Sequence, residues 1–172
     1  MRLSQWAYDF LRVDGSQVNY EQMASARTIR PDELDELLTL YRMLNPDEPE
    51  LQRDDSLHEQ WQRMLRDESV HIVVVEHDNR LVASCILSIT PNLTRGARPF
   101  GLVENVVTHE DYRQNGFGRR CLRKAIEIAE DRECYKIMLL TGSDKEWKHE
   151  FYESCGFDKG AKTGFTLDLR GR

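Results

Sequence analysis

Two glycines between a predicted strand and a predicted helix give this chain its clearest site for binding a ligand. Gly116 and Gly118 belong to the sequence Arg-Gln-Asn-Gly-Phe-Gly at residues 113–118. A glycine has no side chain, so the main chain can approach a ligand closely there. The first N–H groups of the following helix, aided by the helix dipole, attract anions. These residues therefore predict an anion site suited to a diphosphate.

Positive charge gathers at the same junction of an otherwise acidic chain. The 172 residues include 24 lysines and arginines against 30 aspartates and glutamates, which gives a formal net charge of −6. That balance argues against general binding to nucleic acid or to acidic membranes. A basic helix face is usually only solvated, but its coincidence with a glycine-rich turn favours an anion site. The basic residues concerned are Arg113, Arg119, Arg120, Arg123 and Lys124.

Three phosphate-binding patterns can be compared with this junction. A P-loop ends in Gly-Lys-Ser/Thr, which is absent here. A dinucleotide fingerprint, G-x-G-x-x-G/A, is met only approximately, because its third position holds Cys121 and the preceding strands read as antiparallel. The third pattern, R/Q-x-x-G-x-G/A, binds the pyrophosphate of coenzyme A. The sequence Arg113-x-x-Gly116-x-Gly118 fits it.

This loop stands between two further motifs. Glu-Asn-Val-Val-Thr precedes it at residues 104–108, and Phe-Tyr-Glu-Ser-Cys-Gly-Phe follows it at residues 151–157. In this order the three motifs resemble the GCN5-related N-acetyltransferase (GNAT) superfamily over about residues 24–169. Residues 134–137, leading into Phe151, are similar to glucosamine-phosphate N-acetyltransferases. The resemblance implies the GNAT fold, a mostly antiparallel sheet that is splayed at a cofactor slot and flanked by about four helices.

The resemblance also implies which residues hold acetyl-CoA, the acetyl donor. Main-chain N–H groups of the loop cradle the pyrophosphate, and a strand pairs with the pantetheine arm like an added strand. That strand and its neighbour after Tyr135 splay apart. Lys145 and Lys148 replace the family's Asn and small residue, so Ser143 is the candidate to supply one missing contact. The implied donor-binding residues are Val106, Val107, Thr108, Arg113, Gln114, Asn115, Gly116, Phe117, Gly118, Arg119 and Ser143, and no metal is implied.

Tyr152 matches the family's tyrosine that protonates the departing thiolate of coenzyme A. The chemistry asks for such an acid, because a thiolate leaves more easily when protonated, and a hydroxyl with a pKa near ~10 can serve a thiol near ~8.5. Glu104 is the candidate base that deprotonates the amine through water, or else it pairs with a neighbouring cation. By alternation, Glu104 is expected on the same side of its strand as Val106 and Thr108. His109 is a weaker candidate.

Two loops are candidates to bind the amine acceptor, and the sequence leaves the choice between them open. In the family this site is built from the first two helices, their loop, and the loop before the central strand. The acidic loop of residues 45–55 suits a cationic amine. The loop of residues 91–100, with Arg95 and Arg98, suits a phosphate or carboxylate on the acceptor. Solvated loops with no part in binding are an equal alternative.

The elements that position these residues follow the order β-α-α-β-β-β-α-β-α-β. β-branched runs predict strands, helical spacing of apolar residues predicts helices, and Asp78-Asn79 predicts a hairpin turn. This order favours an α/β fold with a mixed (α+β) sheet rather than a strict parallel sheet. The strands are predicted at residues 26–29, 71–76, 81–90, 100–108, 135–140 and 165–169, and the helices after Pro31, after Ser56, at residues 116–130 and after Ser143.

Two helix starts are predicted from capping-box spacing, in which a serine is followed three residues later by a glutamate. Ser56 and Glu59 have this spacing, and so do Ser143 and Glu146. The second of these helices is expected to carry Trp147, Phe151 and Cys155 on one face.

Residues 1–23 are predicted to be an N-terminal extension of a domain at residues 24–172. An apolar stripe there is typical of an amphipathic helix that packs on the domain or on a second copy. No apolar run reaches the ~20 residues that span a bilayer, and the first twenty residues lack a signal-peptide core. The four cysteines show no zinc or disulfide pattern, so reduced thiols and a cytoplasmic location are expected. The stripe consists of Leu3, Trp6, Ala7, Phe10 and Leu11.

The sequence thus predicts an acetyl-CoA-dependent N-acetyltransferase that moves the acetyl group directly to a primary amine in a ternary complex. The acceptor is expected to be a small molecule, with no nucleic acid or membrane partner, and family habit favours a homodimer. The alternative is a catalytically silent acyl-CoA sensor or interaction module, which has no need of an acid such as Tyr152. A nucleotide-binding oxidoreductase is disfavoured by the element order.

Overall fold

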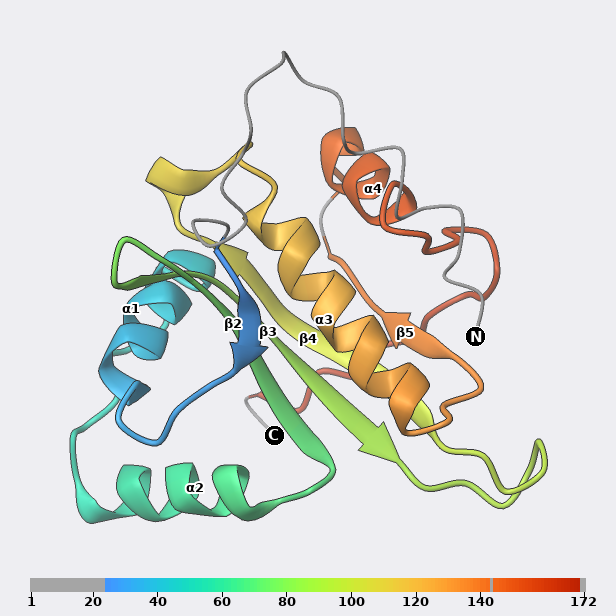
Figure 1. Cartoon of the computed structure of the whole chain (residues 1–172), viewed down its shortest axis with the longest axis horizontal. Coiled ribbons are helices and arrows are strands. Elements are labelled where there is room, and N and C mark those ends of the chain that lie inside the picture. Colours follow the sequence, from blue (N-terminus) through green and yellow to red (C-terminus); the bar gives the residue numbers. More distant parts are fainter. Residues whose placement is uncertain (1–23, 143, 171–172) are drawn as a thin grey trace.

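A five-stranded sheet in the order β1-β2-β3-β4-β5 is the centre of the computed structural model, which describes residues 24–142 and 144–170 (Figure 1). The first four strands are antiparallel, and β5 pairs in parallel with β4, so the predicted mixed sheet is confirmed. The strands are β1 (Ala26–Thr28), β2 (Val70–His77), β3 (Arg80–Thr90), β4 (Phe100–Thr108) and β5 (Ile137–Leu139). The helices are α1 (Leu34–Leu44), α2 (Asp55–Arg66), α3 (Phe117–Asp131) and α4 (Glu146–Glu153), with a short 3-10 helix at Glu110–Tyr112.

Each face of the sheet carries its own hydrophobic core. On one face α3 packs through Cys121 and Leu122, and Figure 1 shows it in front of the sheet, running along the direction of β3 and β4. On the other face α1 and α2 contribute Leu40 and Trp61, which pack against Ile72 of β2. Removing these apolar side chains from water is the main force that holds the layers together. No helix among the described residues is long and apolar enough to cross a membrane.

The β2–β3 hairpin has the predicted two-residue turn. Asp78 and Asn79 both have left-handed backbone conformations, with φ of 50° and 58°. Asp and Asn tolerate this conformation better than other side chains, and it matches the twist of the paired strands. The turn residues alone therefore predicted this connection correctly.

Residues 165–169 do not form a strand, so that prediction was wrong. The segment alternates apolar and polar residues, but Phe165 is 92% exposed and no strand pairing involves it among the described residues. Main-chain N–H and C=O groups form a strand only when a neighbouring strand bonds to them. The edge strand β5 is only three residues long. The alternation of apolar and polar residues is typical of a strand, but it does not show whether a neighbouring strand is there to pair with it.

The predicted helix starts also need correction. α2 begins after Asp54, whose carboxylate accepts a hydrogen bond from the Leu57 N–H at 3.0 Å, so Ser56 lies inside the helix. Aspartate caps a helix as well as serine does. Lys145 holds the N-cap position of α4, and Trp147 is 58% exposed instead of facing the core. Ser143 lies outside the described residues, as does the amphipathic helix predicted within residues 1–23.

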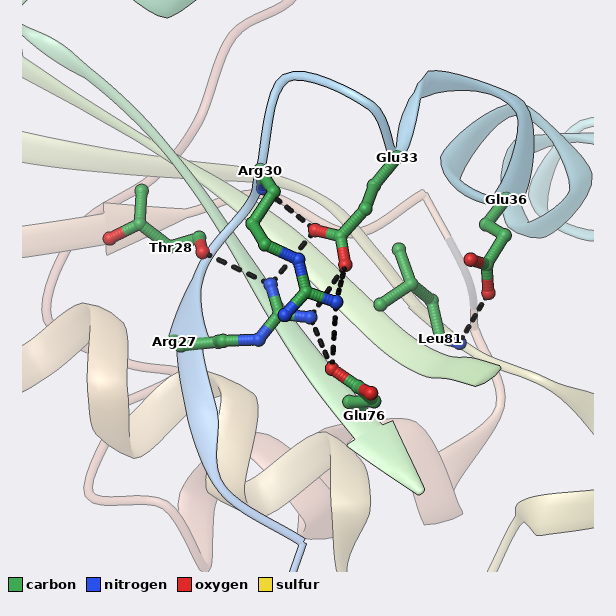
Figure 2. A network of polar contacts seen from close by, with 7 residues as sticks. All are labelled: Arg27, Thr28, Arg30, Glu33, Glu36, Glu76 and Leu81. Atoms are coloured by element: carbon green, nitrogen blue, oxygen red, sulfur yellow. Dashed lines mark hydrogen bonds and ion pairs between the residues drawn. The ribbon is translucent and has the colours of Figure 1, made fainter. Parts of the chain in front are cut away.

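Glu33 is a charged side chain buried between β1, α1 and β2 (Figure 2). Its carboxylate accepts hydrogen bonds from the Arg27 guanidinium at 2.6 and 2.8 Å and from the Arg30 N–H at 2.7 Å. Arg27 also forms an ion pair with Glu76 at the end of β2. These contacts fix the start of α1 against the sheet. One turn later, the Glu36 carboxylate accepts a hydrogen bond from the main chain at the start of β3, at 2.9 Å.

The charge of Glu33 is stabilised in spite of its burial. Burial by itself raises the pKa of this carboxyl group, but hydrogen bonds from Arg27 and the Arg30 main chain outweigh it and hold the pKa below the ordinary value. The hydrogen bond from Arg27 likewise lowers the pKa of Glu76. A carboxylate whose pKa is lowered by folding stabilises the fold above its unfolded pKa. That stabilisation is lost as the pH falls through the folded pKa.

We predict that Glu33→Gln lowers the free energy of unfolding at pH 7 by about 3 kcal/mol, because it leaves the Arg27 guanidinium without its buried counter-charge. The free energy of unfolding of the parent chain should fall as the pH drops below about 4.5. The variant should show a smaller fall, because one of the responsible carboxylates is gone. Urea unfolding followed by circular dichroism at pH 7, 5 and 3 measures both effects.

Glu76→Gln is the matched control. It removes another partner of Arg27, but the Glu76 side chain is 30% exposed against 5% for Glu33. Its loss should cost less than half as much, since an exposed ion pair contributes little. Equal losses in the two variants, or an unchanged pH dependence in Glu33→Gln, would contradict the prediction.

Candidate active site

β4 contains a bulge in its second half. The pairing with β3 shifts register between Ser84 and Ile86, so Asn105 and Val106 of β4 lie opposite a single residue of β3. Asn105 has a left-handed φ of 52°, which asparagine tolerates. Bulges bend a strand and redirect its side chains, and they are common beside active sites.

The bulge reverses the alternation of side chains along β4. Val103 faces the core under α3, and beyond the bulge Val106 faces that same core while Val107 faces the core under α1. Glu104 therefore lies on the side of Val107. The prediction that Glu104 shares a side with Val106 was wrong, because a strict period of two does not count the inserted residue.

The strands β4 and β5 separate immediately after a short pairing. They are bonded only from Gly101 to Val103, as the predicted splay requires. A cavity of about 310 Å³ lies where they part. A wider hollow, of about 680 Å³, runs along α2, but that helix alone lines it and no predicted site residue contributes. The smaller cavity is lined by Leu44, Asn45, Val103, Glu104, Asn105, Val106, Leu139, Leu140, Thr141, Gly142, Lys148 and Tyr152.

Both predicted catalytic side chains line this smaller cavity. Glu104 is exposed, whereas Tyr152 is half-buried and its ring packs 5.2 Å from that of Phe151, between ring centroids. Burial raises the pKa of Tyr152 above its ordinary value, and the nearby carboxylate of Glu104 adds to the rise. The Tyr152 hydroxyl therefore keeps its proton at neutral pH, as a general acid requires.

The side chains of the loop at residues 113–119 largely turn back onto the protein. Asn115 Nδ2 donates to the Arg113 carbonyl at 3.1 Å, and Arg113 Nε donates to the Thr108 carbonyl at 3.3 Å. The Phe117 ring is buried. The first N–H groups of a helix have no partner within it. Main-chain N–H groups are therefore what this loop offers to an anion.

The two glycines of the loop serve different purposes. Gly116 has a left-handed φ of 77°, and a Cβ there would meet nothing within 4 Å, so its backbone conformation is what requires glycine. A Cβ on Gly118 would lie 2.9 Å from Thr108 Oγ1 and 3.3 Å from Phe151 Cζ. Gly118 thus allows α3 to approach β4 and α4 closely. The prediction that the missing side chain makes room for a ligand needs correction for Gly118, whose space is filled by Thr108 and Phe151, and stays a prediction for Gly116.

Much of the predicted positive charge along α3 is engaged by protein groups. Arg120 donates a hydrogen bond to the Ala24 carbonyl at 3.1 Å. Arg123 and Lys124 form ion pairs with Glu127, at 3.7 and 3.4 Å. Arg113, Arg119 and Arg120 bond only to uncharged groups in these contacts, so their positive charge adds to the attraction of the helix end for a phosphate.

The two candidate acceptor loops differ in their contact with the cavity. Asn45, the first residue of the acidic loop, lines it. Arg95 and Arg98 are not among its lining residues. Arg98 instead donates hydrogen bonds to the carbonyl groups of Glu133 and Cys134, at 3.0 and 3.2 Å. Among the described residues, the acidic loop is therefore the one that reaches the cavity.

Several residues that line the cavity were not predicted from the sequence to belong to the site. Asn105 gave the only local signal, because an asparagine among β-branched strand residues can adopt the left-handed conformation of a bulge. Lys148 was noted only as a departure from the family, and its ammonium group lies 5.6 Å from the centroid of the Trp147 ring. The others are brought together by folding alone: Leu44, Leu139, Leu140, Thr141 and Gly142.

Comparison with known proteins agrees with this architecture. A glucosamine 6-phosphate N-acetyltransferase of Trypanosoma brucei brucei is 38% identical over 90 residues, which are 52% of this chain and only 58% of that relative. Glucosamine 6-phosphate N-acetyltransferase 1 of Oryza sativa subsp. japonica is 30% identical over 152 residues, 81% of this chain and 86% of the relative. A solved structure, a putative acetyltransferase from Agrobacterium tumefaciens str. C58, is 45% identical with a TM-score of 0.79, over 84% of this chain and 99% of the other.

The match also extends to a whole family. The model of the acetyltransferase (GNAT) family fits residues 37–157, from within α1 to just beyond α4. This range contains the bulge, the separated strands and the glycine loop described above. The chain therefore belongs to the acetyltransferase (GNAT) family.

Proposed function

We propose that this chain is an acetyl-CoA-dependent N-acetyltransferase that transfers the acetyl group directly to a primary amine of a small molecule in a ternary complex. The observation that carries the proposal is the presence of Glu104 and Tyr152 in one cavity where β4 and β5 separate. An acyl-CoA sensor without catalytic activity would need neither a base nor an acid there. The names of the two curated relatives support an amine acceptor.

The donor fits the loop and the free edge of β4. The N–H groups at residues 113–119 and the start of α3 would bind the diphosphate. Beyond Val103, β4 is no longer paired with β5, so the main chain at Val106 and Thr108 can pair with the pantetheine arm as an added strand. Because the Val107 side chain is buried, only its main chain can take part.

The reaction requires three proton transfers, two from the acceptor nitrogen and one to the departing sulfur. Glu104 accepts a proton from the ammonium form of the acceptor, through water or directly, and frees the nitrogen lone pair. The nitrogen attacks the thioester carbonyl, so a C–N bond forms as the C–S bond breaks. Tyr152 gives its proton to the departing sulfur, which leaves as a thiol. The attacking nitrogen is cationic once the C–N bond forms, and it loses its second proton to the Tyr152 phenolate, which restores the acid. Glu104 releases its proton to solvent.

The proposal also covers the identity of the amine acceptor and the location of the protein in the cell. Glucosamine 6-phosphate is the first acceptor to test, because both curated relatives are named for it. The cavity offers it the carboxylate of Glu104 and the cation of Lys148. The expected cytoplasmic location stays a prediction, which the distribution of a tagged chain between cell fractions would test.

We predict that Tyr152→Phe and Glu104→Gln each lower kcat by about 100-fold, because each removes one proton-transfer group. The Kd of acetyl-CoA should stay unchanged. A thiol-release assay with a panel of amines that includes glucosamine 6-phosphate measures kcat, and calorimetry measures Kd.

Tyr135→Phe is the control, since Tyr135 packs on Phe100 and does not line the cavity. It should leave kcat unchanged. Acetyl-CoA binding without thiol release for any amine would favour the silent sensor. An unchanged rate in Tyr152→Phe would remove Tyr152 from its proposed role.

Gly116→Val should raise the Kd of acetyl-CoA at least about tenfold, because a β-branched residue cannot hold the left-handed turn that orients the loop N–H groups. Gly96→Val is a matched control. Gly96 also has a left-handed φ, of 73°, and open space around it, but it lies in the loop before β4. Both variants should lose similar stability by urea unfolding, while only Gly116→Val loses donor affinity by calorimetry. Equal affinity in the two variants would refute this role of the loop.

The homodimer remains a proposal, supported by three exposed apolar side chains in the last part of the described chain. Phe165, Leu167 and Leu169 are 92%, 68% and 65% exposed. Large apolar side chains that are exposed in a group often mark a contact with a partner, and a second copy is the proposed one. Light scattering should give a mass twice that of one chain, and Phe165→Ser with Leu167→Ser should halve it. A monomer in the parent chain would contradict the proposal.

A further inference from the structure

α4, which carries Tyr152, is held by few contacts. None of its eight residues is fully buried, and Phe151 and Tyr152 pack only partly against the core under α3. An element with little buried apolar surface is displaced more easily than the core. The orientation of Tyr152 therefore depends on the particular residues that fasten α4.

One of these fastenings comes from Arg119 in the first turn of α3. Its Nη1 donates a hydrogen bond to the Ser154 carbonyl at 2.5 Å, and its Nη2 donates to Ser154 Oγ at 2.8 Å. The Ser154 hydroxyl in turn donates to the Phe151 carbonyl at 2.6 Å. Ser154 is the C-cap of α4, so the guanidinium lies where the helix carbonyls are exposed and a positive charge is favourable.

The neighbouring Gly118 adds a second, tight contact between the same two helices. The position of its absent Cβ lies 3.3 Å from Phe151 Cζ, so the α3 main chain contacts the ring directly. Two consecutive residues of α3 thus hold Phe151 and Ser154, which lie on either side of Tyr152 in the chain.

We propose that the Arg119 side chain is a positioning residue for Tyr152 and acts through Ser154. This inference rests on the proposed function, in which the start of α3 binds the donor diphosphate and Tyr152 protonates the leaving sulfur. The contact joins these two sites. Donor binding at the loop therefore also steadies the acid on α4.

Arg119→Lys tests this without removing charge, since lysine keeps the cation but loses the two-pronged donor geometry. We expect kcat to fall about tenfold, because a small displacement of a catalytic group is costly. The Kd of acetyl-CoA should change by less than about twofold, because the substitution leaves the main-chain groups that bind the donor in place. Ser154→Ala should lower kcat similarly. The double variant should be no slower than the slower single variant, because both changes remove one contact.

Arg123→Lys is the matched control, one turn further along α3. Its guanidinium pairs with Glu127 at 3.7 Å and its side chain is 70% exposed. Neither kcat nor the Kd of acetyl-CoA should change in this variant.

Hydrogen exchange of the amides at residues 146–157 gives a readout that does not need turnover. Exchange should be faster in Arg119→Lys and Ser154→Ala than in the parent chain. Coenzyme A should slow it in the parent chain and much less in the variants.

Two results would overturn the inference. One is a tenfold rise in the Kd of acetyl-CoA at unchanged kcat in Arg119→Lys, which would make Arg119 a donor ligand. The other is unchanged exchange over α4 in both variants. If the parent chain releases no thiol with any amine, the proposed function fails, but the exchange experiment still decides whether Arg119 holds α4.

Discussion

The separation of β4 from β5 is the constraint on which the rest of this structure depends. Pairing stops at Val103, and two residues later β4 inserts an extra residue opposite β3. A bulge increases strand twist and disturbs regular pairing, and a cavity opens between β4 and the edge strand β5. The end of α1 lines that cavity with Asn45, and α4 lines it with Tyr152. The cavity is thus reached from both helical layers.

The start of α3 combines ligand binding with packing. Its loop side chains bond to the protein itself, which leaves main-chain N–H groups as the polar surface for an anion. Gly116 provides the turn, whereas Gly118 lets the helix contact Phe151. The helix that would hold the donor is therefore the helix against which the proposed acid is packed. A short distance between the two sites follows from this arrangement, because no intervening element separates them.

In this acidic chain, the local contacts of an ionisable side chain decide its protonation state more than the net charge of the chain does. Glu33 is almost fully buried, yet its pKa is lowered because Arg27 and the Arg30 main chain donate to it. Tyr152 shows the opposite effect, since burial raises its pKa and keeps it protonated. Both groups hold the protonation state that suits their position. The first stabilises the start of α1, and the second keeps a proton in the cavity.

Local patterns were enough to place most of the elements. The residues of β4, the Asp78-Asn79 hairpin and the glycine turn before α3 follow from propensity and turn chemistry, which act between near neighbours in the chain. Only the tertiary structure decided that Phe165 lies outside a strand, because pairing needs a partner from elsewhere. It also decided the side on which Glu104 lies and the contact between Arg119 and α4, because an inserted residue and a long-range hydrogen bond leave no periodic trace in the sequence.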